Sequence, residues 1–315
     1  MAGNQPGATF HAGEQALQAA AGLRERMAEI GPHVIRDHMP DQHRELFDKL
    51  PTLLVAAQDG EGQPWATMLH GAAGFVHTPD ARHMHVATLP AADDPVAPLL
   101  QDGAAVGVLG LEPHTRRRNR ANGLVQARQA TGFTLQVLQS FGNCPKYIHG
   151  RRPEALPART APPAERLGPA FGGAPLALLQ RADTLFIASA SARQAGHGGG
   201  EGVDVSHRGG PSGFIDISPG PAGLRLTLPD YLGNFFFNTL GNLLAWPRAG
   251  LLLVDHAQGG LLHLAAHASI DNDSAAVGAF PGAQRLLRLD LLHGWWRPAA
   301  LPLRWSAPEA PPQFS

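Results

Sequence analysis

The second half of this 315-residue sequence repeats motifs of the first half, which constrains the fold more strongly than any other feature. Gly74-Phe75-Val76 returns as Gly213-Phe214-Ile215, and Thr88-Leu89-Pro90 returns as Thr227-Leu228-Pro229, in both cases 139 residues later. Separate motifs that share one offset indicate a duplicated structural unit. Because two copies are too few for a solenoid, the sequence predicts two similar domains that face each other.

Each copy carries short stretches of strand-forming residues separated by turns. Glycine (37 residues) and proline (28 residues) are frequent, as expected where many turns connect short strands. In the first copy, strands are expected at residues 52–57, 65–70, 74–76, 84–88, 104–109 and 133–138. Helices are expected at 14–30, ended by Gly31-Pro32, and at 40–49. The order of four strands, a short helix and a further strand is that of a small barrel with a helix across one opening.

The composition divides the chain into four segments. Residues 1–50 are expected to form an N-terminal helical segment and residues 51–150 the first barrel domain. Residues 151–170 are rich in proline, alanine and arginine and are expected to be a linker, and residues 171–315 would form the second domain. A glycine-rich insertion at 196–202 is expected at a hairpin tip.

Charge and cysteine content exclude several classes of function. The formal net charge is -1 and only 16% of residues are charged, so no global field attracts nucleic acid or an acidic membrane. The single cysteine, Cys144, cannot form an internal disulfide and is typical of a reducing compartment. Residues 1–10 lack the pattern of a signal peptide, and no apolar run is long enough to span a bilayer. We therefore expect a soluble, cytoplasmic protein.

Three sequence blocks occur in a characteristic order. Residues 140–148 read Ser-Phe-Gly-Asn-Cys-Pro-Lys-Tyr-Ile, residues 204–210 read Asp-Val-Ser-His-Arg-Gly-Gly, and residues 229–243 begin with Pro-Asp-Tyr-Leu-Gly-Asn. The second and third blocks resemble the Asp-x-Ser-Pro-Arg/Lys-Gly-Asp and Pro-Asp-x-x-Gly-Asn motifs of the FMN-binding branch of the pyridoxamine 5'-phosphate oxidase-like family. The first block is typical of larger two-copy members, and the resemblance spans residues 10–305.

This resemblance implies a fold, a cofactor and an activity. The fold would be mainly β with flanking helices (α+β), built from two tandem split β-barrels of the FMN-binding type that form an internal pseudo-dimer. The protein would be an FMN-dependent oxidoreductase that transfers a hydride or electrons to or from a small substrate. NAD(P)H or a separate reductase would supply electrons, and two chains would be able to form a homodimer.

The second copy contains residue types that suit a flavin phosphate. A doubly charged phosphate needs hydroxyls, a guanidinium and backbone donors close together when it leaves water. Ser206, Arg208 and Gly209 supply these groups. Without the resemblance, a solvated arginine beside hairpin glycines would be the plainer interpretation, and the resemblance reverses that preference. His207 would tune the flavin or donate a proton. The candidate cofactor-binding residues of this copy are Ser206, His207, Arg208, Gly209, Asn234, Asn238, Thr239 and Asn242.

One departure from the family pattern directs attention to the first copy. Many relatives carry a basic residue near the position of Phe236, and its absence removes an expected phosphate partner. We expect Arg117 or Arg118, from the arginine run at 116–120, to reach the phosphate across the interface between copies, unless the run is simply a solvated face. At the 139-residue offset, Thr67 replaces Ser206 and Leu69 replaces Arg208, so the first copy keeps the hydroxyl and loses the arginine.

Two other classes of function remain as alternatives. One is a haem-binding or haem-degrading split barrel, in which His207 or His256 would ligate iron. The other is a cofactor-free binding protein with the same fold. No metal site is expected, because the pairs His83/His85 and His263/His267 lack further ligands at recognisable spacing. The sequence identifies no catalytic side chain, and it shows neither a dinucleotide fingerprint nor a nucleophile elbow.

Overall fold

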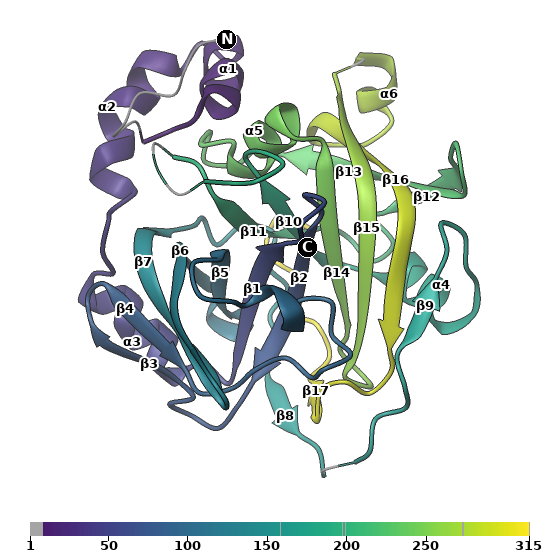
Figure 1. Cartoon of the computed structure of the whole chain (residues 1–315). Helices are drawn as coiled ribbons and strands as arrows, with labels where there is room; N and C mark the ends of the chain where they lie inside the picture. Colours follow the sequence, from purple (N-terminus) through teal and green to yellow (C-terminus); the bar gives the residue numbers. More distant parts are fainter. Residues whose placement is uncertain (1–8, 158, 197, 199, 273, 315) are drawn as a thin grey trace.

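A computed structural model describes residues 9–157, 159–196, 198, 200–272 and 274–314. The chain is mainly β with helices at its periphery, as an α+β fold (Figure 1). The helices are α1 (Ala12–Ala20), α2 (Arg24–Val34), α3 (Asp41–Lys49), α4 (Gly173–Arg181), α5 (Asn238–Ala245) and α6 (Ser274–Gly278).

Most strands belong to two antiparallel sheets. The first sheet contains β1 (Thr52–Gln58), β2 (Pro64–His70), β3 (Val76–Asp80), β4 (His83–Val86), β5 (Ala105–Glu112), β6 (Arg117–Gln129) and β7 (Gly132–Gly142). The second contains β10 (Thr184–Ala190), β11 (Val203–Gly209), β12 (Asp216–Pro219), β13 (Leu224–Tyr231), β14 (Arg248–Asp255), β15 (Gly260–Asp271) and β16 (Ala283–Arg297), with β9 (Glu165–Leu167) paired to β16. The short strands β8 (Pro153–Ala155) and β17 (Leu303–Trp305) pair with each other.

The two sheets share one strand order, as the repeated motifs predicted. The first sheet runs β2-β1-β5-β6-β7-β4-β3, and the second runs β11-β10-β14-β15-β16-β13-β12, which is the same order with each strand number raised by nine. Within the hydrogen-bonded order of the described strands, neither sheet closes into a barrel. The duplication is therefore visible in the topology, while each sheet remains open.

The central strands are apolar on both faces because each lies between two cores. Along β1, Leu53 and Val55 pack into the core of the first sheet, whereas Leu54 and Ala56 pack into a core shared by both sheets. Phe186 of β10 enters the same shared core from the second sheet. Successive side chains of a strand point to opposite faces, so an unbroken apolar run predicts a strand that is covered on both sides.

Two glycines let the sheets approach closely at this shared core. Gly107 of β5 and Gly250 of β14 occupy equivalent places, each opposite an alanine of the neighbouring strand. A β-carbon at Gly107 would lie 2.7 Å from the Cα of Asp204, and one at Gly250 would lie 2.1 Å from the carbonyl oxygen of Pro64. Any larger residue at either position would push the two copies apart.

The structure differs from the sequence-based expectations at several elements. The N-terminal helix is two helices, separated at Gly22 (φ 69°), and α2 continues through Pro32 to Val34. The expected linker contributes β8 and β9, and the arginine run is part of the long strand β6. Strand β6 has few apolar residues, so it gave no strand signal. Residues 197 and 199 of the glycine-rich insertion, like residues 1–8, lie outside the described part of the chain.

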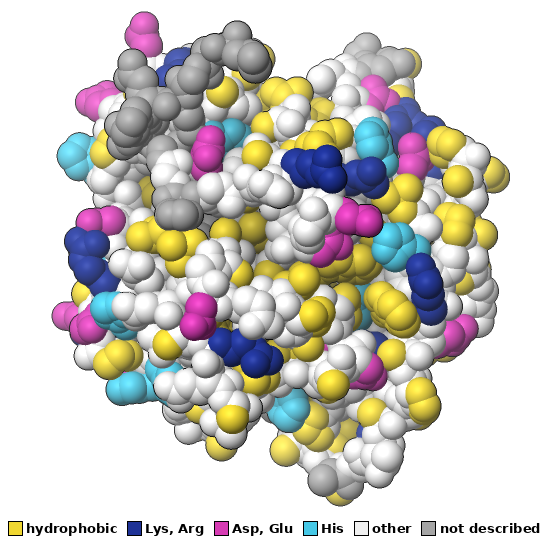
Figure 2. All heavy atoms as spheres, in the orientation of Figure 1, with side chains coloured by type: hydrophobic (Ala, Val, Ile, Leu, Met, Phe, Trp, Pro, Cys, Tyr) yellow, Lys and Arg dark blue, Asp and Glu magenta, His cyan; other side chains and the backbone are white. Residues whose placement is uncertain are grey.

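No helix within the described ranges is both long and apolar enough to cross a bilayer. On the face in Figure 2, basic and acidic side chains are interspersed between apolar ones.

Candidate functional site

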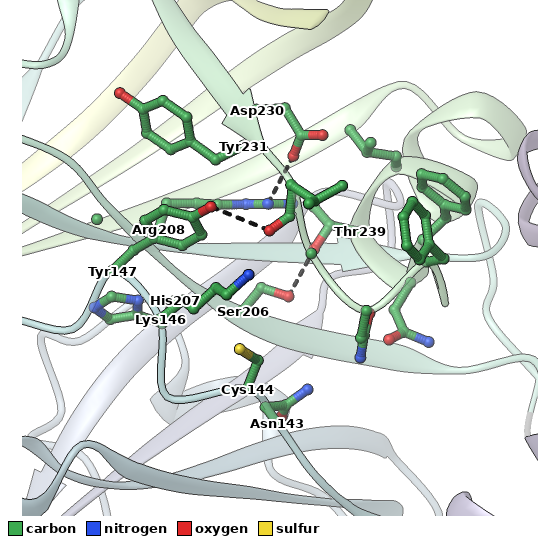
Figure 3. A pocket seen from close by; sticks show the side chains of 18 of the residues that line it. Asn143, Cys144, Lys146, Tyr147, Ser206, His207, Arg208, Asp230, Tyr231 and Thr239 are labelled. Atoms are coloured by element: carbon green, nitrogen blue, oxygen red, sulfur yellow. Dashed lines mark hydrogen bonds and ion pairs between the residues drawn. The ribbon is translucent and has the colours of Figure 1, made fainter. Parts of the chain in front are cut away.

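A cavity that is lined by both copies contains most of the residues proposed from the sequence (Figure 3). The first copy contributes β6 and the segment after β7, whereas the second contributes β11, the end of β13 and the start of α5. The cavity encloses about 140 Å³, which is less than the roughly 300 to 1,000 Å³ of pockets that bury a drug-sized ligand. It is therefore large enough for one end of a cofactor of that size, with the remainder outside.

Three residues around this cavity have strained backbone. Tyr147 (φ 66°), Phe235 (φ 61°) and Phe237 (φ 62°) adopt left-handed conformations that side-chain-bearing residues rarely occupy. All three line the cavity. Such strain persists only where the surrounding structure enforces it, and it is concentrated at functional sites.

The cavity is rich in positive charge. Among the described residues, five basic side chains line it, against a single carboxylate, Asp230. Arg208 Nη1 donates to Asp230 Oδ1 at 2.8 Å, and Arg285 Nε lies 3.8 Å from Asp230 Oδ2. The buried Nε atoms of Arg208 and Arg285 have no hydrogen-bond partner among the described residues. The basic residues are Arg118, Arg120, Lys146, Arg208 and Arg285.

Arg118 carries a charge that no carboxylate balances. Its Nε donates to the Cys144 carbonyl oxygen at 3.0 Å, and no carboxylate lies within ion-pair distance of it among the residues that the structure describes. Burial, together with the charges of Arg120 and Arg208, lowers the pKa of Arg118 to about 9. An anion in the cavity would stabilise the charged form of Arg118 and so raise its pKa again. Arg118 is therefore suited to bind an anion.

Arg120 connects the two copies beneath the cavity. Its Nη1 donates to Asp204 Oδ2 at 2.7 Å and to Asn238 Oδ1 at 3.1 Å, and its Nη2 donates to Ser206 Oγ. Ser206 Oγ and Thr239 Oγ1 lie 2.6 Å apart, as a hydrogen-bonded pair from β11 and α5. The buried Arg120 is thus neutralised by Asp204 and fixes the hydroxyls that face the cavity.

The helix α1 supports this arrangement from behind. Glu14 Oε1 accepts a hydrogen bond from Asn238 Nδ2 at 2.6 Å, and Oε2 accepts one from the His11 backbone N–H at 2.9 Å. Burial raises the pKa of Glu14 to about 8. Gly241 allows the contact, because a β-carbon there would lie 2.6 Å from the Glu14 backbone nitrogen. The N-terminal helix therefore positions the first turn of α5.

His207 is held neutral. Burial, with positive charge nearby from Arg118, lowers its pKa well below the ordinary value. Its ring packs edge-on against Phe186 with centroids 5.7 Å apart. Its Nδ1 has no hydrogen-bond partner within the described residues. A neutral imidazole with one unused nitrogen can donate or accept a single hydrogen bond at physiological pH.

Aromatic rings surround the opening. Tyr147 stacks on Tyr231 with ring centroids 5.1 Å apart and an interplanar angle of 25°, and its hydroxyl donates to the Leu232 carbonyl oxygen at 3.1 Å (Figure 3). Phe235 and Phe237 pack edge-on with centroids 6.2 Å apart. Phe236 instead joins an apolar cluster below. The phenylalanine run therefore divides between cavity wall and core.

Most of the residues proposed from the sequence line this cavity. They are Ser206, His207, Arg208, Gly209, Asn234, Asn238, Thr239 and Arg118. Arg117 is exposed on the other face of β6, where its Nη2 donates to the Gln42 carbonyl oxygen at 3.3 Å. Asn242 lies one turn deeper in α5, where its Nδ2 donates to Ser189 Oγ at 3.0 Å. Neither residue lines the cavity.

The sequence analysis overlooked Arg120, Lys146, Tyr147, Tyr231 and Arg285. Once β6 is known to be a strand, its alternation places Arg118 and Arg120 on one face and Arg117 on the other. The period of two in Arg118-x-Arg120 was therefore the signal for the cross-copy arginines. Lys146 and Tyr147 belong to the block at 140–148, which carried no residue-level assignment.

Comparison with known proteins gave distant structural neighbours only. No family model and no curated protein sequence matches this chain. The structural neighbours include a candidate pyridoxamine 5'-phosphate oxidase from Lactobacillus delbrueckii (12% identity, 34% of this chain, 95% of that chain, TM-score 0.27) and the heme storage protein HutZ from Vibrio cholerae (15%, 39%, 91%, TM-score 0.27). MrkH in complex with c-di-GMP from K. pneumonia is another (11%, 84%, 87%, TM-score 0.24). At these TM-scores the likenesses support no assignment of function.

Proposed function

We propose that the cavity binds FMN through its phosphate and that the chain is an FMN-dependent oxidoreductase of the pyridoxamine 5'-phosphate oxidase-like family, with its two open sheets as tandem split barrels. The observation that supports this most strongly is Arg118, a cation with no carboxylate partner among the described residues, which lines the same cavity as Ser206 and Thr239. The sequence block from 204 to 210, which resembles the family's phosphate motif, forms that wall.

The chemistry of the wall suits a phosphate. Arg118 and Lys146 of the first copy supply charge, and Ser206 and Thr239 of the second copy supply hydroxyls. A partly buried dianion requires both opposite charge and hydrogen-bond donors, and neither copy provides the full set alone. Arg208 is already paired with Asp230, so it contributes its remaining guanidinium donors rather than an unpaired charge.

The remainder of such a cofactor would extend towards the aromatic opening. The enclosed volume of about 140 Å³ suits the phosphate end, so a flavin ring would lie by Tyr147, Tyr231 or Phe237. When bound, the flavin supplies the hydride or electron transfer. The chain's own residues would bind, orient and shield it, and neutral His207 would hold one hydrogen bond near the phosphate segment. A small substrate and either NAD(P)H or a reductase would complete the reaction.

The haem alternative has less support in the site. His256 does not line this cavity; its ring packs edge-on against Trp305 with centroids 5.2 Å apart, and burial lowers its pKa to about 3. His207 is the histidine in the cavity wall, and it lies among arginines. For a cofactor-free binding protein, the unbalanced charge of Arg118 would require a ligand that is an anion.

Spectroscopy of the purified chain tests the proposal. We expect a flavin absorption spectrum, or uptake of FMN in preference to FAD by the ligand-free protein in an equilibrium titration. A haem spectrum, tighter binding of FAD, or no binding of either flavin would contradict it.

A further inference from the structure

The first copy contains a structural counterpart of the Ser206 position. Thr67 pairs with Val55 between β2 and β1, and Ser206 pairs with Ile187 between β11 and β10, at the same place in the repeat. Arg120 of β6 pairs with Leu109 of β5, and His263 of β15 pairs with Leu252 at the same place in the second copy. His263 is therefore the counterpart of Arg120. The internal duplication therefore relates the cavity wall to a second location in the molecule.

A buried carboxylate occupies that second location. Asp94 Oδ2 accepts hydrogen bonds from Thr67 Oγ1 at 2.6 Å and from Arg297 Nη1 at 2.7 Å, and Oδ1 accepts one from the Val96 backbone N–H at 2.9 Å. Asp94 is only 2% exposed. A hydroxyl, a guanidinium and a backbone amide around one carboxylate are the donor types that bind a small oxyanion.

The neighbouring groups leave Arg297 as the main cation. His263 lies with Nε2 3.9 Å from Asp94 Oδ2, while its Nδ1 donates to the Ala66 carbonyl oxygen at 2.9 Å. Burial lowers the pKa of His263, so the ring is neutral. Asp93 also contacts Arg297, at 2.7 Å from Nη2, but its side chain is 46% exposed. The two carboxylates on Arg297 therefore differ mainly in burial.

We propose that the first copy retains an anion-binding site whose ligand is the chain's own Asp94 carboxylate, held by Thr67 and Arg297 at the counterpart of the Ser206 position. Removing that carboxylate opens the site to a small carboxylate anion such as formate. With Asp94 in place the site is closed, so the intact chain takes one phosphate-bearing ligand rather than two. The geometry of Asp94 stands whether or not the cavity between the copies binds FMN.

Chemical rescue of Asp94→Gly by formate tests the proposal. Loss of the carboxylate leaves Arg297 buried without its main partner, so we expect Tm to fall by roughly 6 to 20 °C. Sodium formate should restore Tm in a saturable manner, well beyond sodium chloride at equal ionic strength. Asp93→Gly is the matched control, because water replaces its exposed carboxylate, and it should respond to formate no more than the unsubstituted chain does.

Equal responses of the two variants to formate, or equal effects of formate and chloride on Asp94→Gly, would overturn the proposal. If Asp94→Gly fails to fold in chloride, its refolding yields in formate and in chloride are compared instead. Failure to refold in both salts would also overturn the proposal. The unsubstituted chain gives a second measurement, because saturation with two FMN per chain would show that the first copy's site is open. Absence of any FMN binding would count against the proposed cofactor and leave the formate experiment unaffected.

Discussion

Replacement of Arg118 by glutamine removes one of the two first-copy charges that are proposed to hold the phosphate, the other being Lys146. The guanidinium has no carboxylate partner in the part of the chain that the structure describes, and burial together with the charges of Arg120 and Arg208 lowers its pKa to about 9. Its removal should therefore leave Tm of the ligand-free protein unchanged or higher. With FMN, the lost hydrogen bond to a charged group costs about 1.5 to 3 kcal/mol, or roughly a 10- to 150-fold rise in Kd.

Arg117→Gln is the control for this change, since it removes the same charge from the next residue. Arg117 is exposed and faces away from the cavity, so Kd for FMN and Tm should both stay close to those of the unsubstituted chain. Flavin fluorescence titrations at two salt concentrations measure the effect, and Arg118→Gln should also flatten the salt dependence of Kd. Equal Kd values for the two variants would refute the assignment of Arg118.

Three further predictions follow from the same structure. Arg208→Ala should weaken FMN binding by about 1.5 to 3 kcal/mol with the fold intact, whereas Leu69→Ala, in the buried core, should lower the free energy of unfolding by about 2 to 5 kcal/mol. Flavin titrations and denaturant melts of both variants test this, and it would be contradicted if Leu69→Ala weakened FMN binding while Arg208→Ala destabilised the fold. Gly107→Ala should lower the free energy of unfolding by about 1 to 3 kcal/mol, because a β-carbon there forces the sheets apart. Gly60→Ala, where the added β-carbon meets open space, should leave that free energy unchanged. Equal stability of the two variants in denaturant melts would refute the close approach of the sheets at Gly107. The pKa of Glu14 is about 8 in the folded protein against an ordinary value of 4.5, so between these pH values the folded state keeps a proton that the unfolded state loses. The free energy of unfolding should therefore fall as pH rises from about 4.5 to 8. Glu14→Gln should remove this contribution in thermal melts across that range, and an unchanged pH dependence would disprove the prediction.

The duplication was predictable from motifs that recur at one offset, and the two sheets do share one strand order. The motifs at offset 139 lie at equivalent places in the topology, because residues 74–75 precede β3 as residues 213–215 precede β12, and residues 88–90 follow β4 while residues 227–229 end within β13. The strand expected at residues 52–57 corresponds to β1. Strand β6 was not predictable in this way, because its first half is polar and its buried residues, such as Arg120, are satisfied by partners from the other copy. A pattern of hydrophobicity cannot reveal a strand whose inward side chains are charged and paired.

The candidate site was predictable as a set of residue types but not as a set of contacts. The second-copy block from Ser206 to Gly209 was identified by its motif, and it lines the cavity. The pairing of Arg208 with Asp230, and the role of Glu14 beneath Asn238, depend on segments brought together only by folding. Of the two arginines offered from the sequence, Arg118 lines the cavity and Arg117 does not, because adjacent residues of a strand face opposite sides.

Comparison of FMN with riboflavin isolates the contribution of the phosphate, because the two molecules share the same ring and ribityl chain. If Arg118, Lys146, Ser206 and Thr239 hold the phosphate, FMN should bind the ligand-free chain at least tenfold more tightly than riboflavin, a difference of about 1.4 kcal/mol or more. Equal affinity for the two flavins, measured by fluorescence quenching under identical conditions, would contradict the proposal that this cavity binds FMN by its phosphate.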